Sequence, residues 1–248
     1  MISNVPILTV DTPVAKPTML ALSDRLRAQV DRKRNYLVCK RAADIVFAVL
    51  FIVVILSWVL PVLALLIKLS SKGPVFFRQR RIGLGGRSFI CYKLRTMIVN
   101  TEADTRQAAA CDNRLTRLGL FLRKTNMDEF PQFFNVLKGE MSIVGPRPHM
   151  YADCRLFSSM LPGYKFRNMV RPGITGLAQV KGYHGPTLTR NSILIRYHWD
   201  EYYIKHIGMA LDCRIVLTTI YQAFSVMLGY ITPSWSFRKE TSTEINSI

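Results

Sequence analysis

Two neighbouring carboxylates, Asp128 and Glu129, stand just before Pro131 in the segment KTNMDEFPQFFNVLKGE, residues 124–140. Acids are scarce in this chain, which has 16 Asp plus Glu against 34 Lys plus Arg, so an adjacent pair needs a reason. One reason is structural. If Asp128 caps a helix, Glu129 and Pro131 fall in its first turn, where acids offset the helix dipole and the N–H that proline lacks has no partner anyway.

Basic residues on both sides of the pair point to phosphate chemistry as well. They are Arg114, Arg117, Arg123 and Lys124 upstream, and Lys138 and Arg147 downstream. A helix start surrounded by arginines can bind phosphate, and Mg²⁺ takes one or two carboxylates together with phosphate oxygens. Because neighbouring helical residues point about 100° apart, one carboxylate can hold a metal while the other attacks phosphorus, as in aspartyl-phosphate enzymes. We therefore expect a helix start that is also a phosphoryl-transfer site.

The net charge of +18 requires an anionic partner, which could be nucleic acid, anionic lipid or a phosphorylated substrate. A nucleic-acid binder does not explain the uncharged segment described next, and no recognition motif is present. The five cysteines lie far apart and the four histidines form no metal motif. This usage is typical of reduced thiols in a domain that faces the cytosol.

An uncharged, apolar run extends from Ile45 to Ile67, and about 20 apolar residues suffice to cross a bilayer. Lys and Arg cluster on both of its flanks, and such residues collect on the cytoplasmic side of membranes. A single span would place one cluster outside, whereas a helix that enters, bends and returns keeps both inside. Pro61 removes a backbone hydrogen bond and Ser57 can bond a freed backbone group. We therefore predict a re-entrant, monotopic helix that breaks at Ser57 and Pro61.

The chain is predicted to be a helix-dominated α+β protein. Residues 1–36 form a partly disordered extension with a basic helix at 18–36, residues 37–72 the re-entrant membrane helix, residues 73–228 a small cytosolic catalytic domain, and residues 229–248 a polar tail. Two strands, in GPVFFRQRRIG and GRSFICYKLRTM, form a hairpin around the turn Gly83–Gly86. Helices are expected at 101–110, 114–124, about 129–138, 193–206 and 210–228, some of them amphipathic and interfacial. The segments GEMSIVGPRPHM and RPGITGLAQVKG are expected to be loops.

Several long blocks resemble the bacterial sugar transferase family over about residues 38–224. They are KRAAD, IKLSSKGPVFFRQRRIG, FICYKLRTM, NRLTRLGLFLRKTNMDEFPQFFNVLKGEMSIVGPRP and RPGITGLAQVKG. These are the monotopic polyprenyl-phosphate phosphoglycosyl transferases that start exopolysaccharide and O-antigen assembly. The chain is more similar to the exopolysaccharide-initiating hexose-phosphate transferases than to the large members with several spans. One departure is that Trp58, not a proline, follows Ser57, which leaves the position of the bend open.

The resemblance implies a reaction. A hexose-1-phosphate, from galactose or glucose, moves from a UDP-sugar to undecaprenyl phosphate and UMP is released. Asp128 would be the nucleophile that forms a covalent phosphosugar intermediate, and Glu129 would bind Mg²⁺ or Mn²⁺. The residues implied to bind substrate or phosphate are Arg147, Arg114, Arg117, Lys93, Arg95, Lys40, Arg41 and Gln179.

The same resemblance implies a location at the bacterial inner membrane, with the catalytic domain facing the cytoplasm. The expected partners are the UDP-sugar, undecaprenyl phosphate and membrane lipid, with a homodimer as a further possibility and no nucleic acid. Asp200 and Asp212 match two acids of the family, for which a structural ion pair and a site role stay equal alternatives. A non-enzymatic basic scaffold at the membrane surface is the main alternative function. It would leave the acidic pair and the segment GPRP without a use.

Overall fold

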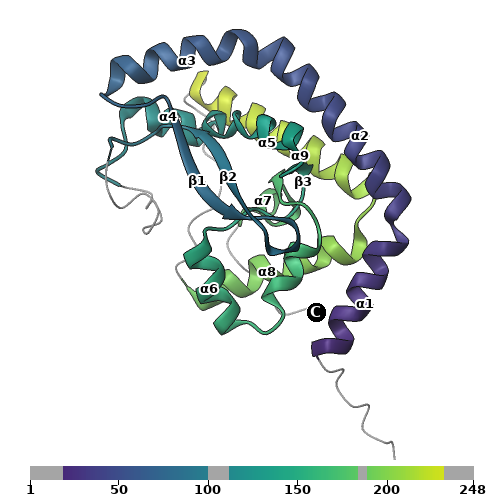
Figure 1. The fold of residues 1–248 in the computed structure, drawn as a ribbon. Coiled ribbons are helices and arrows are strands. Elements are labelled where there is room, and N and C mark those ends of the chain that lie inside the picture. Colours follow the sequence, from purple (N-terminus) through teal and green to yellow (C-terminus); the bar gives the residue numbers. More distant parts are fainter. Residues whose placement is uncertain (1–18, 100–111, 184–188, 232–248) are drawn as a thin grey trace, which may run out of the picture.

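The computed structural model describes residues 19–99, 112–183 and 189–231. The predicted helix at 101–110, residues 1–18 of the N-terminal extension and the polar tail from residue 232 lie outside these ranges. The helix-dominated α+β class is confirmed, since helices of 4 to 23 residues surround two small two-stranded sheets (Figure 1).

The N-terminal half of the fold is dominated by one long apolar helix. After α1 (Met19–Arg32), α2 (Arg34–Phe51) and α3 (Ser57–Ser70) are joined through the π-helical turn η1 (Ile52–Leu56) into a helix of 37 residues. In Figure 1 this helix bends and arches over the rest of the chain. By length and composition alone, it and α9 (Met209–Ile231) are long and apolar enough to cross a membrane.

The irregular hydrogen bonding of the arch lies before Ser57 and not at Pro61. A π-helical turn occupies Ile52–Leu56, and the Ser57 hydroxyl donates to the carbonyl oxygen of Val53 at 2.7 Å. Pro61 sits inside α3, where the helix continues. The predicted bend is therefore present, but the proline does not interrupt the helix. The change in the helical hydrogen-bond pattern lies upstream of Pro61, at the π-helical turn, and such π-bulges commonly bend helices.

The predicted hairpin is confirmed. Strands β1 (Phe76–Ile82) and β2 (Ser88–Leu94) pair antiparallel from Phe76↔Leu94 to Ile82↔Ser88. Their connection contains the short 3₁₀ turn η2 (Leu84–Gly86), in which Gly85 and Gly86 take φ of 64° and 79°. Residues without a side chain adopt this left-handed region at little cost, which explains the glycine-rich turn.

The C-terminal half consists of short elements and two long helices. They are α4 (Arg117–Lys124), η3 (Met127–Glu129), α5 (Gln132–Lys138), β3 (Ser142–Val144), α6 (Tyr151–Met160), η4 (Tyr164–Met169), β4 (Gly173–Thr175), α7 (Leu177–Val180), α8 (Arg190–His206) and α9. The prediction that GEMSIVGPRPHM and RPGITGLAQVKG are loops is wrong in part. The first contains β3 and the second contains β4 and α7, and the two strands pair in parallel. Three-residue strands bounded by glycine and proline are too short to show an alternating pattern.

The core is built jointly by the long helix and the rest of the chain. Ala48 of α2 is fully buried in a cluster with Phe133 and Val136 of α5, and the Phe51 ring stacks on Phe133 with centroids 4.0 Å apart. Leu63 and Ile67 of α3 pack with Leu94 and Leu122 in a second cluster. The opposite side of the helix exposes large apolar residues, including Val46, Val53, Val54, Trp58, Val62, Leu65 and Leu69.

Candidate active site

A tight turn between α4 and α5 places the acidic pair. Asn126 takes a left-handed φ of 57°, and Met127, Asp128 and Glu129 form the 3₁₀ turn η3. Helix α5 begins only at Gln132, with Pro131 at its N-cap. The prediction that Asp128 caps this helix is therefore wrong, because the left-handed residue starts a separate turn before it. The turn directs both acids inward, and their residues are 7 % and 6 % exposed.

Glu129 is held by two cations from different elements. Its carboxylate accepts hydrogen bonds from both terminal nitrogens of Arg147, at 3.1 and 2.5 Å, and from Lys93 Nζ of β2 at 2.6 Å. Burial would raise the pKa of Glu129, but the charges and hydrogen bonds of Arg147 and Lys93 outweigh it and hold the pKa well below its ordinary value. Glu129 is thus a permanent anion that fixes two cations at the bottom of the site.

Asp128 has a different environment. Among the described residues, its carboxylate forms no hydrogen bond or ion pair. Burial, with a contribution from the charge of Glu129, raises its pKa to about 6, although Lys93, Arg123 and Arg147 act in the opposite direction. The result is a carboxylate that is ionised at neutral pH, poorly solvated and not bound to a cation, and such a group is a good nucleophile.

Arg123 and Thr96 close the side of the site towards α4. The Arg123 Nε donates to the Thr96 hydroxyl at 2.8 Å, and the Thr116 side chain caps α4 by accepting from the Gly119 N–H at 2.9 Å. Gly119 lies against the Thr96 main chain so closely that a Cβ would stand 1.9 Å from the Thr96 carbonyl oxygen. The close approach of α4 to the end of β2 keeps the charge of Arg123 near Asp128.

The eight residues predicted to bind substrate or phosphate lie in different places. Only Lys93 and Arg147 contact the acidic pair among the described residues. Arg114 is paired with Asp112 at 2.7 Å, and Arg117 is exposed at the start of α4. Gln179 donates to the carbonyl of Ile174 at 3.0 Å, and its Oε1 is buried without a hydrogen-bond partner.

The other three of these residues hold the long helix in place. Arg95 donates to the carbonyl oxygens of Lys72 and Ser71 at 2.8 and 2.6 Å, at the C-terminal end of α3. Arg41 donates to the last carbonyls of α5, at Val136 and Leu137. Lys40 forms an ion pair of 2.5 Å with Asp212 of α9.

Asp212 joins three elements. Besides Lys40, it accepts hydrogen bonds from the hydroxyls of Tyr36 in α2 and Tyr203 in α8. Asp44, also of α2, accepts from the main-chain N–H of Ile143 in β3. Both buried acids thus connect the start of the long helix to the C-terminal half of the fold. Of the two alternatives for Asp212, a structural ion pair and a role in the site, its contacts support the structural ion pair.

A divalent cation bound by Glu129 fits these contacts poorly. Both oxygens of Glu129 already accept from Arg147 or Lys93, whose charges would repel a metal ion. The part of the chain that the structure describes contains no group of three or more His, Cys, Asp and Glu residues suited to a metal. The expected Mg²⁺ or Mn²⁺ stays a prediction, and we assign no chemical step to it.

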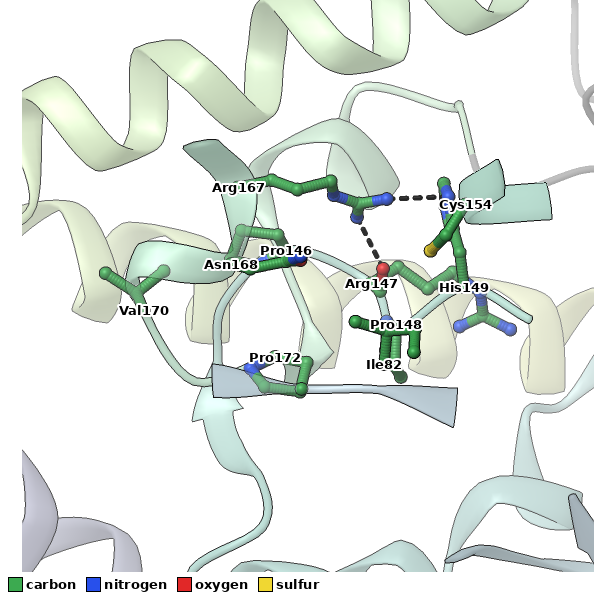
Figure 2. A pocket seen from close by; sticks show the side chains of 11 residues that line it. Ile82, Pro146, Arg147, Pro148, His149, Cys154, Arg167, Asn168, Val170 and Pro172 are labelled. Atoms are coloured by element: carbon green, nitrogen blue, oxygen red, sulfur yellow. Dashed lines mark hydrogen bonds between the residues drawn. The ribbon is translucent and has the colours of Figure 1, made fainter. Parts of the chain in front are cut away.

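Arg147 belongs to the GPRP segment, which lies over a small pocket. Ile82 and Gly83 at the end of β1, Pro146 to His149, and Arg167 of η4 line part of it (Figure 2). Gly145 passes so close to the neighbouring main chain that a Cβ would be 2.4 Å from the Arg171 carbonyl oxygen. The segment therefore has little freedom, and the guanidinium that it carries is held in one place.

The sequence model of the bacterial sugar transferase family matches residues 35–226, which contain all of these residues. The chain belongs to this family. Relatives include a UDP-glucose:undecaprenyl-phosphate glucose-1-phosphate transferase of Escherichia coli, 45% identical over 192 residues, which are 77% of this chain and 41% of that protein. An Aeromonas hydrophila UDP-N-acetylgalactosamine-undecaprenyl-phosphate N-acetylgalactosaminephosphotransferase is 45% identical over 186 residues, 75% of this chain and 43% of that protein.

Another relative is matched over almost its whole length. It is the "Exopolysaccharide production protein PSS" of Rhizobium leguminosarum, which is 42% identical over 189 residues, 74% of this chain and 94% of that protein. By contrast, the chain spans only about 40% of the Klebsiella pneumoniae glucose-1-phosphate transferase that it also matches. The similarity therefore lies in the part that carries the acidic pair, whatever else the larger relatives contain.

Sequence reasoning missed the buried polar residues behind Arg147. They are His149, Tyr164, Arg167 and Arg196, together with the half-buried Arg81. Arg167 and Arg196 are 4 % and 7 % exposed, an unusual burial for arginine. The available signal was modest: Arg196 and Asp200 lie four residues apart on one face of α8, with Ile193, Tyr203 and Ile204 buried near them.

Proposed function

We propose that this protein transfers a sugar-1-phosphate from a UDP-sugar to undecaprenyl phosphate and releases UMP. The single observation that carries the proposal is the contrast between the two acids. Glu129 is fully engaged by Arg147 and Lys93, whereas Asp128, its neighbour, is buried and has no partner within the described residues. A structural role explains the first acid but gives no reason to bury the second. The names of the relatives support the same reaction class.

In the proposed first step, a carboxylate oxygen of Asp128 attacks the phosphorus that bears the sugar. The new bond is an aspartyl–phosphate bond, and the bond between this phosphorus and the oxygen of UMP breaks, so UMP leaves with its electron pair. Arg147 and Lys93 stabilise the negative charge that spreads over the phosphoryl oxygens. A pKa near 6 leaves Asp128 mostly ionised at pH 7, so no base is needed.

In the second step, a phosphate oxygen of undecaprenyl phosphate attacks the same phosphorus. The aspartyl–phosphate bond breaks, the carboxylate of Asp128 is restored and a lipid-linked diphosphosugar is formed. The two displacements balance without an external acid or base. The donor is proposed to be a UDP-hexose, glucose or galactose first. The N-acetylgalactosamine in the name of one relative makes UDP-N-acetylgalactosamine the next to test.

The long helix is proposed to insert into the cytoplasmic membrane and return, so that the site faces the cytoplasm. Support comes from its bend, its exposed apolar residues and the basic residues on both flanks. Arg95, which donates to carbonyl oxygens at the C-terminal end of α3, comes directly after the last residue of β2, the strand that carries Lys93. The site therefore stays close to the membrane surface, where a lipid phosphate would be.

The test of function uses membranes that contain the full chain, undecaprenyl phosphate, Mg²⁺ and one UDP-sugar at a time, with UMP as the measured product. Release of UMP from at least one donor is expected, and the absence of UMP with every donor would refute the proposal. Asp128→Asn should form no phosphosugar adduct with the donor alone, as read by mass spectrometry. An adduct on this variant would assign the nucleophile elsewhere.

Topology is tested by labelling two cysteines with a membrane-impermeant maleimide. One is the native, exposed Cys39 before the apolar run, and the other is introduced as Lys72→Cys after it. Both should react only from the cytoplasmic side. Labelling from opposite sides would establish a span instead. Loss of all UMP release combined with retained membrane binding would favour the alternative of a non-enzymatic scaffold.

A further inference from the structure

The main chain of Arg147 is fixed by a buried polar network on the side away from Glu129. The terminal nitrogen Nη2 of Arg167 donates to the Arg147 carbonyl oxygen at 2.5 Å, and Nη1 lies 2.6 Å from His149 Nδ1. Figure 2 shows both contacts, which bring η4 against the GPRP segment. Nη1 also donates to the Tyr164 hydroxyl at 2.6 Å. Arg167 therefore bonds the carbonyl of the residue whose guanidinium holds Glu129.

Asp200 supplies the negative charge for this network. Its Oδ2 lies 3.0 Å from Arg167 Nη2, and both side chains are at least 96 % buried, with 3 % and 4 % exposed. The pair comes from two elements, η4 and α8, that are in contact. A buried guanidinium without a carboxylate is strongly unfavourable, so Asp200 fixes the position that Arg167 can take. Burial raises the pKa of Asp200, and the charges of Arg167 and of Arg196, one turn earlier on α8, act in the opposite direction and favour the ionised carboxylate.

His149 is the neutral partner of Arg167 and adds no charge to the network. Burial and the neighbouring arginines lower its pKa well below the ordinary value, so the ring is neutral and accepts from Arg167. The ring packs edge-on against Phe157 at 5.6 Å between centroids. A rigid, neutral acceptor on one side and a carboxylate on the other leave Arg167 one orientation, the one that reaches the Arg147 carbonyl.

We propose that Arg167 and Asp200 are positioning residues for phosphoryl transfer, which act by fixing the Arg147 main chain and through it the guanidinium that meets Glu129. Neither residue contacts the acidic pair in the structure. The inference rests on the proposed function for its kinetic part. A displacement of about 1 Å in a charge-stabilising group can cost about 100-fold in rate, so variants that release the Arg147 carbonyl should lower kcat for UMP release by about 10- to 100-fold.

The kinetic test is a double-mutant cycle in the full chain. Asp200→Asn and Tyr164→Phe weaken the network without removing Arg167, and each is combined with Arg147→Ala. If the network acts through Arg147, each variant lowers kcat in the wild-type background but changes it by less than about 2-fold when Arg147 is already alanine. Equal losses in both backgrounds would overturn the proposal, because they would show an independent or merely structural effect.

Tyr197→Phe is the matched control. The Tyr197 ring lies in the same aromatic cluster, 6.0 Å from Tyr164 between centroids, but its hydroxyl donates to the Gly163 carbonyl and not to Arg167. Its kcat should equal that of the wild type. A loss as large as that of Tyr164→Phe would mean that any loosening of this cluster affects activity, which contradicts a specific role for Arg167.

A second measurement does not depend on turnover. Phenylglyoxal modifies accessible arginines, and 26 % of the Arg147 side chain is accessible. The rate of its modification in the intact, folded protein, measured by mass spectrometry, reports how firmly the guanidinium is held. The rate should rise several-fold in Asp200→Asn and Tyr164→Phe and stay unchanged in Tyr197→Phe. Unchanged rates in all three variants would refute the positioning role even if the enzyme releases UMP. A rise in a protein that releases no UMP would instead refute only the proposed function.

Discussion

The burial of Asp128 predicts that its replacement by asparagine makes the protein more stable while abolishing the proposed adduct. Wild-type Asp128 is 7 % exposed and has no cationic partner among the described residues, so its charge is carried at a cost. Asparagine has nearly the same shape and no charge. The variant should therefore fold with the same structure and lose only the electrostatic penalty.

The size of this penalty follows from the shift of the pKa. Burial raises the pKa of Asp128 from 3.8 to about 6, which corresponds to on the order of 3 kcal/mol of lost unfolding free energy when the group is ionised in both states. The folded carboxyl binds its proton more tightly than the unfolded one, so the cost is absent below about pH 4 and complete above about pH 6. For a chain of this size, 3 kcal/mol is about 6–12 °C in Tm.

The assay is thermal unfolding of both proteins in the same detergent at several values between pH 3.5 and pH 7.5. Tm of Asp128→Asn should exceed that of the wild type at pH 7, and the difference should vanish towards pH 4. Glu201→Gln is the control, since Glu201 forms a surface pair with Lys205 at 2.9 Å and should change Tm little. A variant less stable than the wild type at pH 7, or a difference that does not change with pH, would refute the assignment of Asp128 as an unpaired buried anion.

Three further predictions follow from other contacts. UMP release with the donor alone, without lipid acceptor, should rise about 10-fold from pH 5 to pH 7 with a midpoint near 6, because Asp128 must be ionised; a flat profile would exclude it as the titrating nucleophile. Gly119→Ala should destabilise the protein by about 1–3 kcal/mol, since its Cβ would stand 1.9 Å from the Thr96 oxygen, whereas helix propensity alone would give a gain of about 1 kcal/mol; denaturant unfolding decides between the two signs. Lys40→Met should lower the unfolding free energy by about 3 kcal/mol by breaking a largely buried ion pair with Asp212. It should leave the KM for the UDP-sugar within about 2-fold, and a large rise in KM would instead support the substrate-binding role expected for Lys40.

The sequence is sufficient to bring Asp128, Glu129 and Arg147 into one hypothesis, because acids are rare in this chain and basic residues recur around them, whereas Lys93 enters only through the family resemblance. It does not reveal which basic side chains are free to bind a phosphate and which donate to main-chain carbonyl oxygens. Arg95 shows the difficulty, since this cation follows Lys93 closely, just past the end of β2, yet it holds the end of α3. Only the course of the main chain decides between these partners.

Two local features of the backbone could not be predicted from the sequence pattern either. The left-handed Asn126 turns the acidic pair inward before α5 begins, and no proline or glycine announces it. The π-helical turn at Ile52–Leu56 lies in a uniformly apolar sequence, IVVIL, so nothing in its composition indicates a break there. The turn lies between two tertiary contacts of the long helix: Ala48 and Phe51 pack on α5 before it, and Leu63 and Ile67 pack on β2 and α4 after it.

The shared core described above has a consequence for how this protein is made in the cell. Ala48, Leu63 and Ile67 complete two core clusters whose other buried members come from residues 89–141, so these two clusters stay open when the long helix is not packed against them. If the long helix inserts as proposed, a chain in which it is not yet packed and inserted would expose that helix and leave these two clusters open, and would be a substrate for chaperones and proteases. Under the proposed topology and mechanism, membrane insertion and assembly of the Asp128 site would be one maturation event. Under the proposed topology, an acid able to form a phosphosugar adduct arises only at the membrane surface and not on stray chains in the cytosol.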